Sequence, residues 1–133
     1  MIYMSAIRIF VVLLIIAFHP ANSIAGDLKK AATQKEFNAA FNKMLDDPAN
    51  IDLTIKYANI AIALEDYEAA IPPLERLLLF NPDLHKIKQE LGVLYYRLGS
   101  LDMAKSYLQS AKEGNNVPKD VIELADQYLN KIK

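Results

Sequence analysis

Few residues of this chain could do metal chemistry. The 133 residues contain no Cys and two His, and only His85 lies outside the apolar N-terminal region. A metal site would need a second His, a Cys or a carboxylate at ligand spacing, and Asp83 is better explained as a helix cap. We therefore interpret His85 as a surface residue and predict no metal site.

Nucleophilic and phosphate chemistry have no candidate residues either. Ser100 and Ser106 lack a nearby His or Lys that could act as a base. The four Gly residues are dispersed, so no glycine-rich phosphate loop is present. Residues 46–52 are rich in oxygen ligands but lack the glycine and terminal glutamate of a calcium loop, and we interpret them as a helix stop followed by a helix cap. We expect a non-enzymatic protein without catalytic residues or cofactor.

Composition narrows the class of protein further. The length fits a single domain. Lys and Arg number 15 against 16 Asp and Glu, so the chain lacks the basic excess that is typical of a nucleic-acid binder. The absence of Cys excludes a disulfide framework.

The first 25 residues have the pattern of a secretory signal peptide. One Arg, at position 8, precedes an unbroken apolar run over residues 9–18, and small residues at 23 and 25 precede Gly26. A basic start, a short apolar stretch and a small-x-small end predict cleavage after Ala25 and export, which we place in the bacterial periplasm. The alternatives are a retained membrane anchor, for which the run is short, and a buried core helix.

The remaining chain, residues 26–133, has helical spacing and almost no strand signal, so an all-α fold is expected. Apolar residues recur at spacings of three and four residues. This pattern is interrupted at Pro48, Asn81-Pro82, Gly99 and Gly114-Asn115-Asn116. These breaks predict six helices over residues 27–46, 53–64, 67–80, 84–98, 100–113 and 118–132. Pro72-Pro73 falls inside the third, where we expect a kink that turns the carbonyls of Glu68 and Ala69 toward water.

The helical region repeats itself with a period of 34 residues. Shifting the sequence by this number pairs residues that are apolar or small: Tyr57 with Leu91, Ala58 with Gly92, Ala61 with Tyr95, Leu64 with Leu98, Ala70 with Ala104 and Leu74 with Leu108. Two antiparallel helices approach closely where one presents Gly or Ala, which explains the recurrence of small residues.

These residues resemble the tetratricopeptide repeat family, a 34-residue helix–turn–helix array. Residues 85–118 carry the stronger copy, with Leu91-Gly92, Tyr95, Gly99, Ala104, Leu108 and Ala111 at the family's offsets. Residues 51–84 carry a weaker copy, in which Tyr57, Ala61 and Glu65 replace the usual Leu, Tyr and Gly. The resemblance implies a short helical solenoid, with 27–46 as the remnant of a preceding repeat and 118–132 as a capping helix.

In this family the first helix of each repeat lines a concave groove that binds ligands. A solvated face would carry similar residues, but several here are apolar or aromatic where packing does not require burial, which favours a peptide or protein partner. The matching positions are Asp52, Ile55, Lys56, Asn59, Ile62, Lys86, Gln89, Glu90, Val93, Tyr96 and Arg97.

The identity of that partner stays open. The co-chaperone clamp for acidic C-terminal peptides is not expected, because Ile55 and Glu90 replace its Lys and Asn. Residues 47–52, 74–84 and 91–95 are also similar to periplasmic repeat segments that precede outer-membrane β-barrels in surface-protein exporters, which makes an outer-membrane protein a candidate partner. The alternatives are a scaffold or assembly factor of an envelope complex, either a stand-alone or a truncated relative of such exporters, and an anchored inner-membrane protein.

Overall fold

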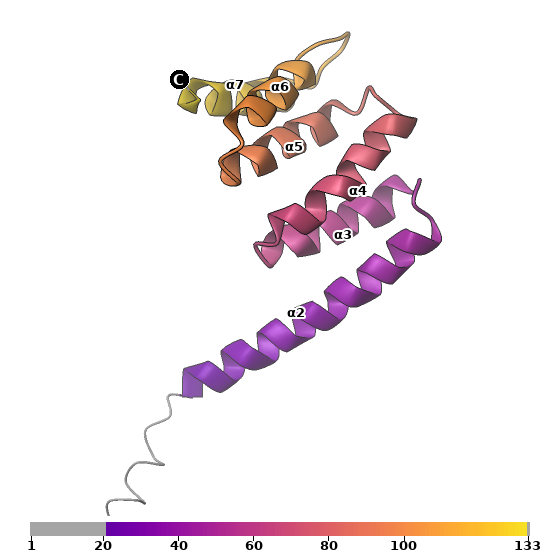
Figure 1. Ribbon diagram of the computed structural model, residues 1–133, viewed down its shortest axis with the longest axis vertical. Helices are drawn as coiled ribbons and strands as arrows, with labels where there is room; N and C mark the ends of the chain where they lie inside the picture. Colours follow the sequence, from indigo (N-terminus) through magenta and orange to yellow (C-terminus); the bar gives the residue numbers. More distant parts are fainter. Residues whose placement is uncertain (1–20, 133) are drawn as a thin grey trace, which may run out of the picture. The chain divides into compact units, whose positions relative to one another are not determined.

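The computed structural model describes residues 21–132, with side chains from Thr33 onward. These residues form helices and no strands, so the all-α prediction is confirmed (Figure 1). The helices are α2 (Ala21–Asp46), α3 (Ile51–Ala63), α4 (Tyr67–Phe80), α5 (His85–Arg97), α6 (Leu101–Ala111) and α7 (Lys119–Lys131).

The residues from Glu36 onward form a compact unit of their own, and the packing below is that of this unit. The expected signal peptide lies mostly in residues 1–20, outside the described part. Helix α2 begins at Ala21, earlier than the expected start at residue 27. Within residues 21–132, no helix is both long enough and apolar enough to cross a membrane.

The turns between helices form largely where the sequence predicts them. The Asn50 side chain accepts a hydrogen bond from the Leu53 amide (3.1 Å), which confirms the stop and cap in residues 46–52. Asp66 accepts in the same way from Ala69 (3.2 Å). Leu84 rather than the expected Asp83 occupies the cap position of α5. Ser100 occupies the cap position of α6, although its side chain accepts no hydrogen bond from the helix.

Helix α4 continues through Pro72 and Pro73. Each proline lacks the amide that would bond to the carbonyl four residues earlier, so the first turn loses two hydrogen bonds. The hydrogen bond from the Ala69 amide to the Asp66 side chain stabilises this turn, and Pro73 is buried in the core. These contacts explain why the helix tolerates both residues.

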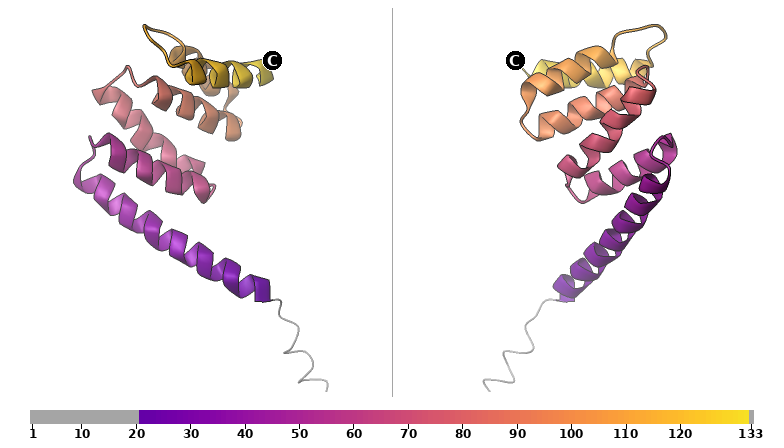
Figure 2. Two further views of the ribbon diagram at one scale, coloured as in Figure 1. Left: turned by 180° about the vertical axis from the view of Figure 1, so that it is seen from behind. Right: turned by 45° about the vertical axis from the view of Figure 1, so that its right-hand side comes forward.

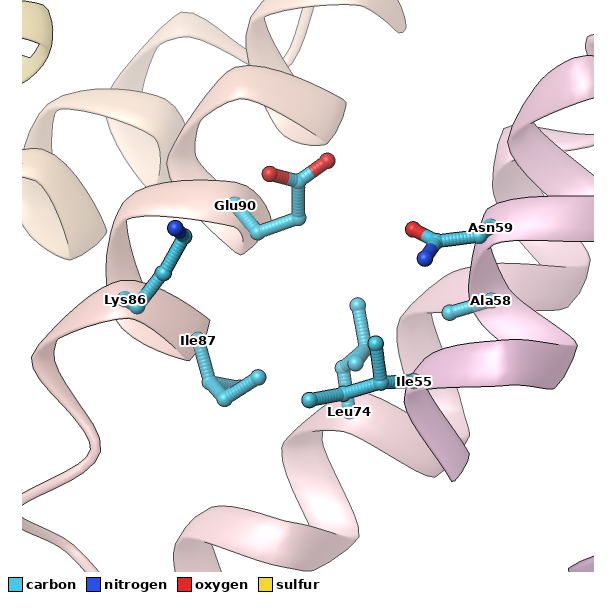
Figure 3. A pocket seen from close by; sticks show the side chains of 7 residues that line it. All are labelled: Ile55, Ala58, Asn59, Leu74, Lys86, Ile87 and Glu90. Carbon is cyan, nitrogen blue, oxygen red and sulfur yellow. The ribbon is translucent and has the colours of Figure 1, made fainter. Parts of the chain in front are cut away.

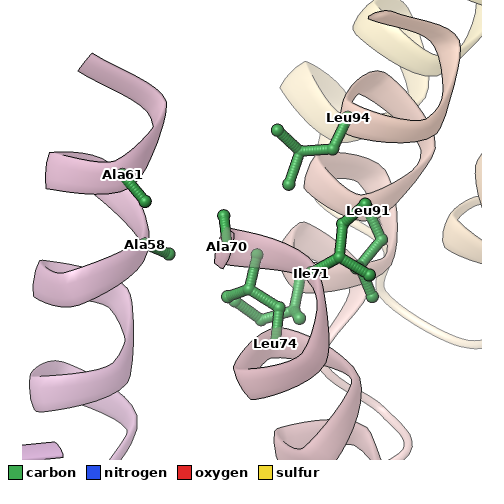
Figure 4. Packing of buried hydrophobic residues seen from close by; sticks show 8 residues of the cluster. Ala58, Ala61, Ala70, Ile71, Leu74, Leu91 and Leu94 are labelled. Carbon is green, nitrogen blue, oxygen red and sulfur yellow. The ribbon is translucent and has the colours of Figure 1, made fainter. Parts of the chain in front are cut away.

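Consecutive helices pack as hairpins, α3 on α4 and α5 on α6, and α7 packs on both α5 and α6 (Figure 2). The main core joins the hairpins through Ala58, Ala61, Ala70, Ile71, Leu74, Ile87, Leu91 and Leu94 (Figure 4). A second cluster joins α2 to α3, where Phe37 and Phe41 lie 5.0 and 5.5 Å from the Tyr57 ring.

Helices α5 and α6 approach each other closely at Gly92. A Cβ atom at this position would lie 2.6 Å from Leu108 Cγ and 3.1 Å from the Leu108 backbone nitrogen. Only glycine permits this separation. The structure therefore gives the physical reason for the Gly at this offset of the repeat.

Candidate functional site

A pocket of about 380 Å³ opens between the first helices of the two hairpins. Helix α3 contributes one wall and α5 the other, and Leu74 of α4 closes the bottom (Figure 3). Its lining residues are Ile55, Ala58, Asn59, Leu74, Lys86, Ile87 and Glu90.

The pocket has an apolar floor and a polar rim. Ile55, Leu74 and Ile87 converge at its bottom, while the Asn59 amide and the Glu90 carboxylate extend toward each other across the opening (Figure 3). Leu74 and Ile87 are buried, whereas Asn59 is exposed. This arrangement suits a ligand with an apolar body and polar groups at its edge.

Glu90 is the charged group most affected by the pocket. It is half-buried, and burial raises the pKa of its carboxyl above the ordinary value, against the opposing influence of Arg97 and Lys86. Within residues 33–132, no side chain donates a hydrogen bond to it or forms an ion pair with it. The carboxylate is thus partly dehydrated and unpaired at the pocket mouth.

The structure brings together four of the eleven predicted groove residues: Ile55, Asn59, Lys86 and Glu90. Of the others on α3, Asp52 and Lys56 are exposed away from the pocket lining. Ile62 is half-buried and packs against the main core. A binding role for these residues stays a prediction.

Two predicted groove residues are misplaced. Gln89 and Val93 have only 4% and 7% of their surface exposed, so they offer almost no surface to a partner. The reason is that α5 packs against α7 as well as α4 and α6, which covers the side of α5 that the repeat pattern alone leaves open.

Tyr96 and Arg97, at the end of α5, already have partners within the chain. The Tyr96 ring meets the Tyr128 ring edge-on, with centroids 5.1 Å apart. Arg97 lies over the Tyr67 ring and donates a hydrogen bond from Nη1 to the Tyr67 hydroxyl (3.1 Å). Both residues therefore help to hold helices together, whatever their part in binding.

His85 is half-buried rather than a simple surface residue. Its Nδ1 atom is buried and makes no hydrogen bond with any described residue, and Gly114 lies close to its ring. In the described part of the chain, no three His, Asp or Glu residues are grouped closely enough to hold a metal ion. The placement of His85 results from the loop that follows α6, whose approach the local sequence does not indicate.

A polar cluster that the sequence analysis missed joins the two hairpins. The hydroxyls of Tyr95 and Tyr107 both donate to Glu75 Oε1 (2.8 and 2.9 Å), and the two rings stack. Burial and the bond to Glu75 raise the pKa of Tyr95 to about 12 and raise that of Tyr107 as well. The available signal was the charged pair Glu75-Arg76 within the apolar second half of helix α4.

No protein-family model matches the chain, and a search of curated protein sequences found no similar sequence. The tetratricopeptide resemblance accordingly rests on the residues and offsets given above.

Proposed function

We propose that this chain is an exported, non-enzymatic interaction module of the tetratricopeptide type, which binds a peptide or protein segment between α3 and α5. The observation that carries the proposal is the α3–α5 pocket, because it unites an apolar floor with a polar rim contributed by two successive repeats. Four of the residues that the family resemblance assigns to the groove line it. Apolar anchors surrounded by polar groups are typical of segment recognition.

The binding proposal can be tested by photocrosslinking in the cells that make the protein. A photoreactive residue in place of Asn59 should give discrete adducts that mass spectrometry identifies, while the same residue in place of Gln109, exposed on α6, should not. Equal adducts from both positions, or none from position 59, would contradict the proposal. An outer-membrane protein among the adducts would support the exporter resemblance.

A matched pair of substitutions separates the pocket from general surface effects. Ile55→Asp places a charge on the apolar floor and should abolish the position-59 adduct. Lys105→Asp, at an exposed position of α6 outside the predicted groove, should leave it. Circular dichroism should show unchanged helix content in both variants.

The export part of the proposal rests on the N-terminal sequence pattern. Protein isolated from the producing cells should begin at Gly26 and be found in the periplasmic fraction. A chain that retains residues 1–25 and sediments with the inner membrane would support the anchored alternative instead.

A scaffold that assembles through the C-terminal end of α4 is the second candidate function. Leu79 and Phe80, at the end of α4, are 83% and 65% exposed, which is unusual for two adjacent large apolar residues. A mass that rises with concentration in light scattering, and falls with Leu79→Glu but not with Met103→Glu on α6, would favour this function.

A further inference from the structure

The charge of Glu90 at the pocket mouth indicates which kind of partner the pocket would bind. Burial and rim geometry give Glu90 a carboxylate that is partly dehydrated before any ligand arrives. A fixed charge of this kind discriminates between ligands, because like charges placed against it are rejected and opposite charges pair with it.

The cations near this carboxylate, Lys86 and Arg97, favour its ionised form but form no ion pair with it. Lys86 is one turn earlier on α5, yet its exposed side chain stays on the α5 side of the opening and forms no ion pair with Glu90 (Figure 3). Arg97 is engaged with Tyr67. A cation brought by a ligand would therefore meet a carboxylate that no side chain of the described residues occupies.

The floor adds a second requirement. Its residues Ile55, Leu74 and Ile87 are aliphatic and offer no polar atom, so a purely polar ligand would lose water there without compensation. The ligand must thus combine an apolar group with a positive charge placed about a side-chain length away.

We propose that the α3–α5 pocket takes a basic, apolar protein segment: an apolar side chain enters its floor, and a neighbouring lysine or arginine pairs with Glu90. This inference rests on the proposed function. It predicts that acidic peptides and phosphate-bearing ligands bind more weakly than basic ones, because each would bring negative charge to the Glu90 carboxylate.

Three probes with one apolar body and different charges test the proposal: 3-phenylpropylamine, 3-phenylpropanol and 3-phenylpropanoate. Each is titrated into the isotope-labelled full chain, and amide shifts are followed by NMR. The amine should shift the Asn59 and Ile87 amides and bind about fivefold more tightly than the alcohol, as expected for a partly buried charge pair. The propanoate should bind most weakly.

Substitutions test whether Glu90 causes the preference for the amine over the alcohol. Glu90→Gln should abolish the preference for the amine and leave binding of the alcohol unchanged. Glu113→Gln, at an exposed position after α6, should preserve it. Ile55→Ala should weaken binding of the amine and the alcohol alike, because it removes part of the floor.

The outcomes distinguish failure of this inference from failure of the proposed function. Equal binding of amine and alcohol, or tightest binding of the propanoate, would overturn the basic partner while leaving a pocket that binds. The absence of shifts with all three probes would also overturn it, and crosslinking from position 59 would then decide separately whether the groove captures a segment.

Discussion

Equivalent positions of the two helix hairpins meet different surroundings. Ile55 and Asn59 of α3 line an open pocket, whereas Gln89 and Val93, 34 residues later on α5, are buried. Helices α5 and α7 pack against each other, but α3 and α5 do not make a comparable contact. The same 34-residue pattern thus gives an open interface in one place and a closed one in the next, and helix α7 makes the difference.

The turns and crossings of the hairpins differ as well. The second hairpin has Gly92 at the helix crossing and Gly99 in the turn, where the first has Ala58 and Glu65. Both turn residues adopt the left-handed conformation, with φ of 61° at Glu65 and 76° at Gly99. The second hairpin therefore has the residue that its backbone favours, and the first keeps the same backbone at a cost.

The largest predicted effect comes from exchanging side chains between the open and the closed interface. Val93→Asn should lower the free energy of unfolding by about 3 kcal/mol, because it removes buried apolar surface and buries a side-chain amide without a hydrogen-bond partner. Asn59→Val, the reverse exchange at the exposed equivalent, should change it by less than about 0.5 kcal/mol. Urea denaturation measures both. Equal effects would mean that α7 does not close the second interface.

The helix crossing supplies the next test. Gly92→Ala should lower the free energy of unfolding by about 2 kcal/mol, because the added Cβ overlaps Leu108 and part of the obstacle is backbone. Ala58→Gly should cost about 1 kcal/mol for a different reason, the greater chain entropy of glycine. A neutral Gly92→Ala would show that α5 and α6 lie farther apart than described.

The turn residues should respond to substitution with opposite signs. Gly99→Ala should destabilise by about 1 kcal/mol, since no atom lies within 4 Å of the added Cβ and the effect is purely one of backbone conformation. Glu65→Gly should stabilise by a similar amount, because glycine adopts φ of 61° without strain. Melting temperatures report both changes, and a shared sign would refute the equivalence of the two turns.

Most of the fold could be predicted from local signals. Pro48, Gly99 and Gly114 interrupt the helical periodicity where helices end, and the small residues Ala58 and Gly92 indicate where helices cross. The start of α2 was placed too late, because nothing between Ala21 and residue 27 discriminates helix from processing segment.

The lining of the pocket was predicted only in part, because the packing of helices against one another decides which predicted positions stay open. The offsets that identify Ile55 and Asn59 on α3 identify Gln89 and Val93 on α5 equally well, and only the position of α7 separates them. Ile87 was not predicted as a site residue, because its position in the pattern is typical of the core, yet a core residue can also form the floor of a pocket.

The polar cluster between the hairpins gives a prediction that depends on pH. The pKa of Tyr107 is raised in the folded state, so the native protein keeps this proton where the unfolded chain loses it, and stability falls as pH rises above the ordinary tyrosine value of 10.0. Tyr107→Phe should cost about 1 kcal/mol at neutral pH through the lost bond to Glu75 and should flatten this alkaline decline. Tyr128→Phe, outside the cluster, should leave the decline unchanged.

The smallest effect concerns Glu90, which occupies the position equivalent to the exposed Lys56. Burial raises its folded-state pKa, so the native state binds more protons than the unfolded chain just above the ordinary carboxyl value, and stability falls as pH rises through that range. Glu90→Gln should therefore raise the free energy of unfolding at neutral pH by no more than about 0.5 kcal/mol, which melting temperatures would report. In acid the variant should lose this advantage. Glu113→Gln should show no such pH dependence. A Glu90→Gln protein that is less stable at neutral pH would show that Lys86 or Arg97 already pairs with the carboxylate, and the pocket would then have no charge to offer a basic partner.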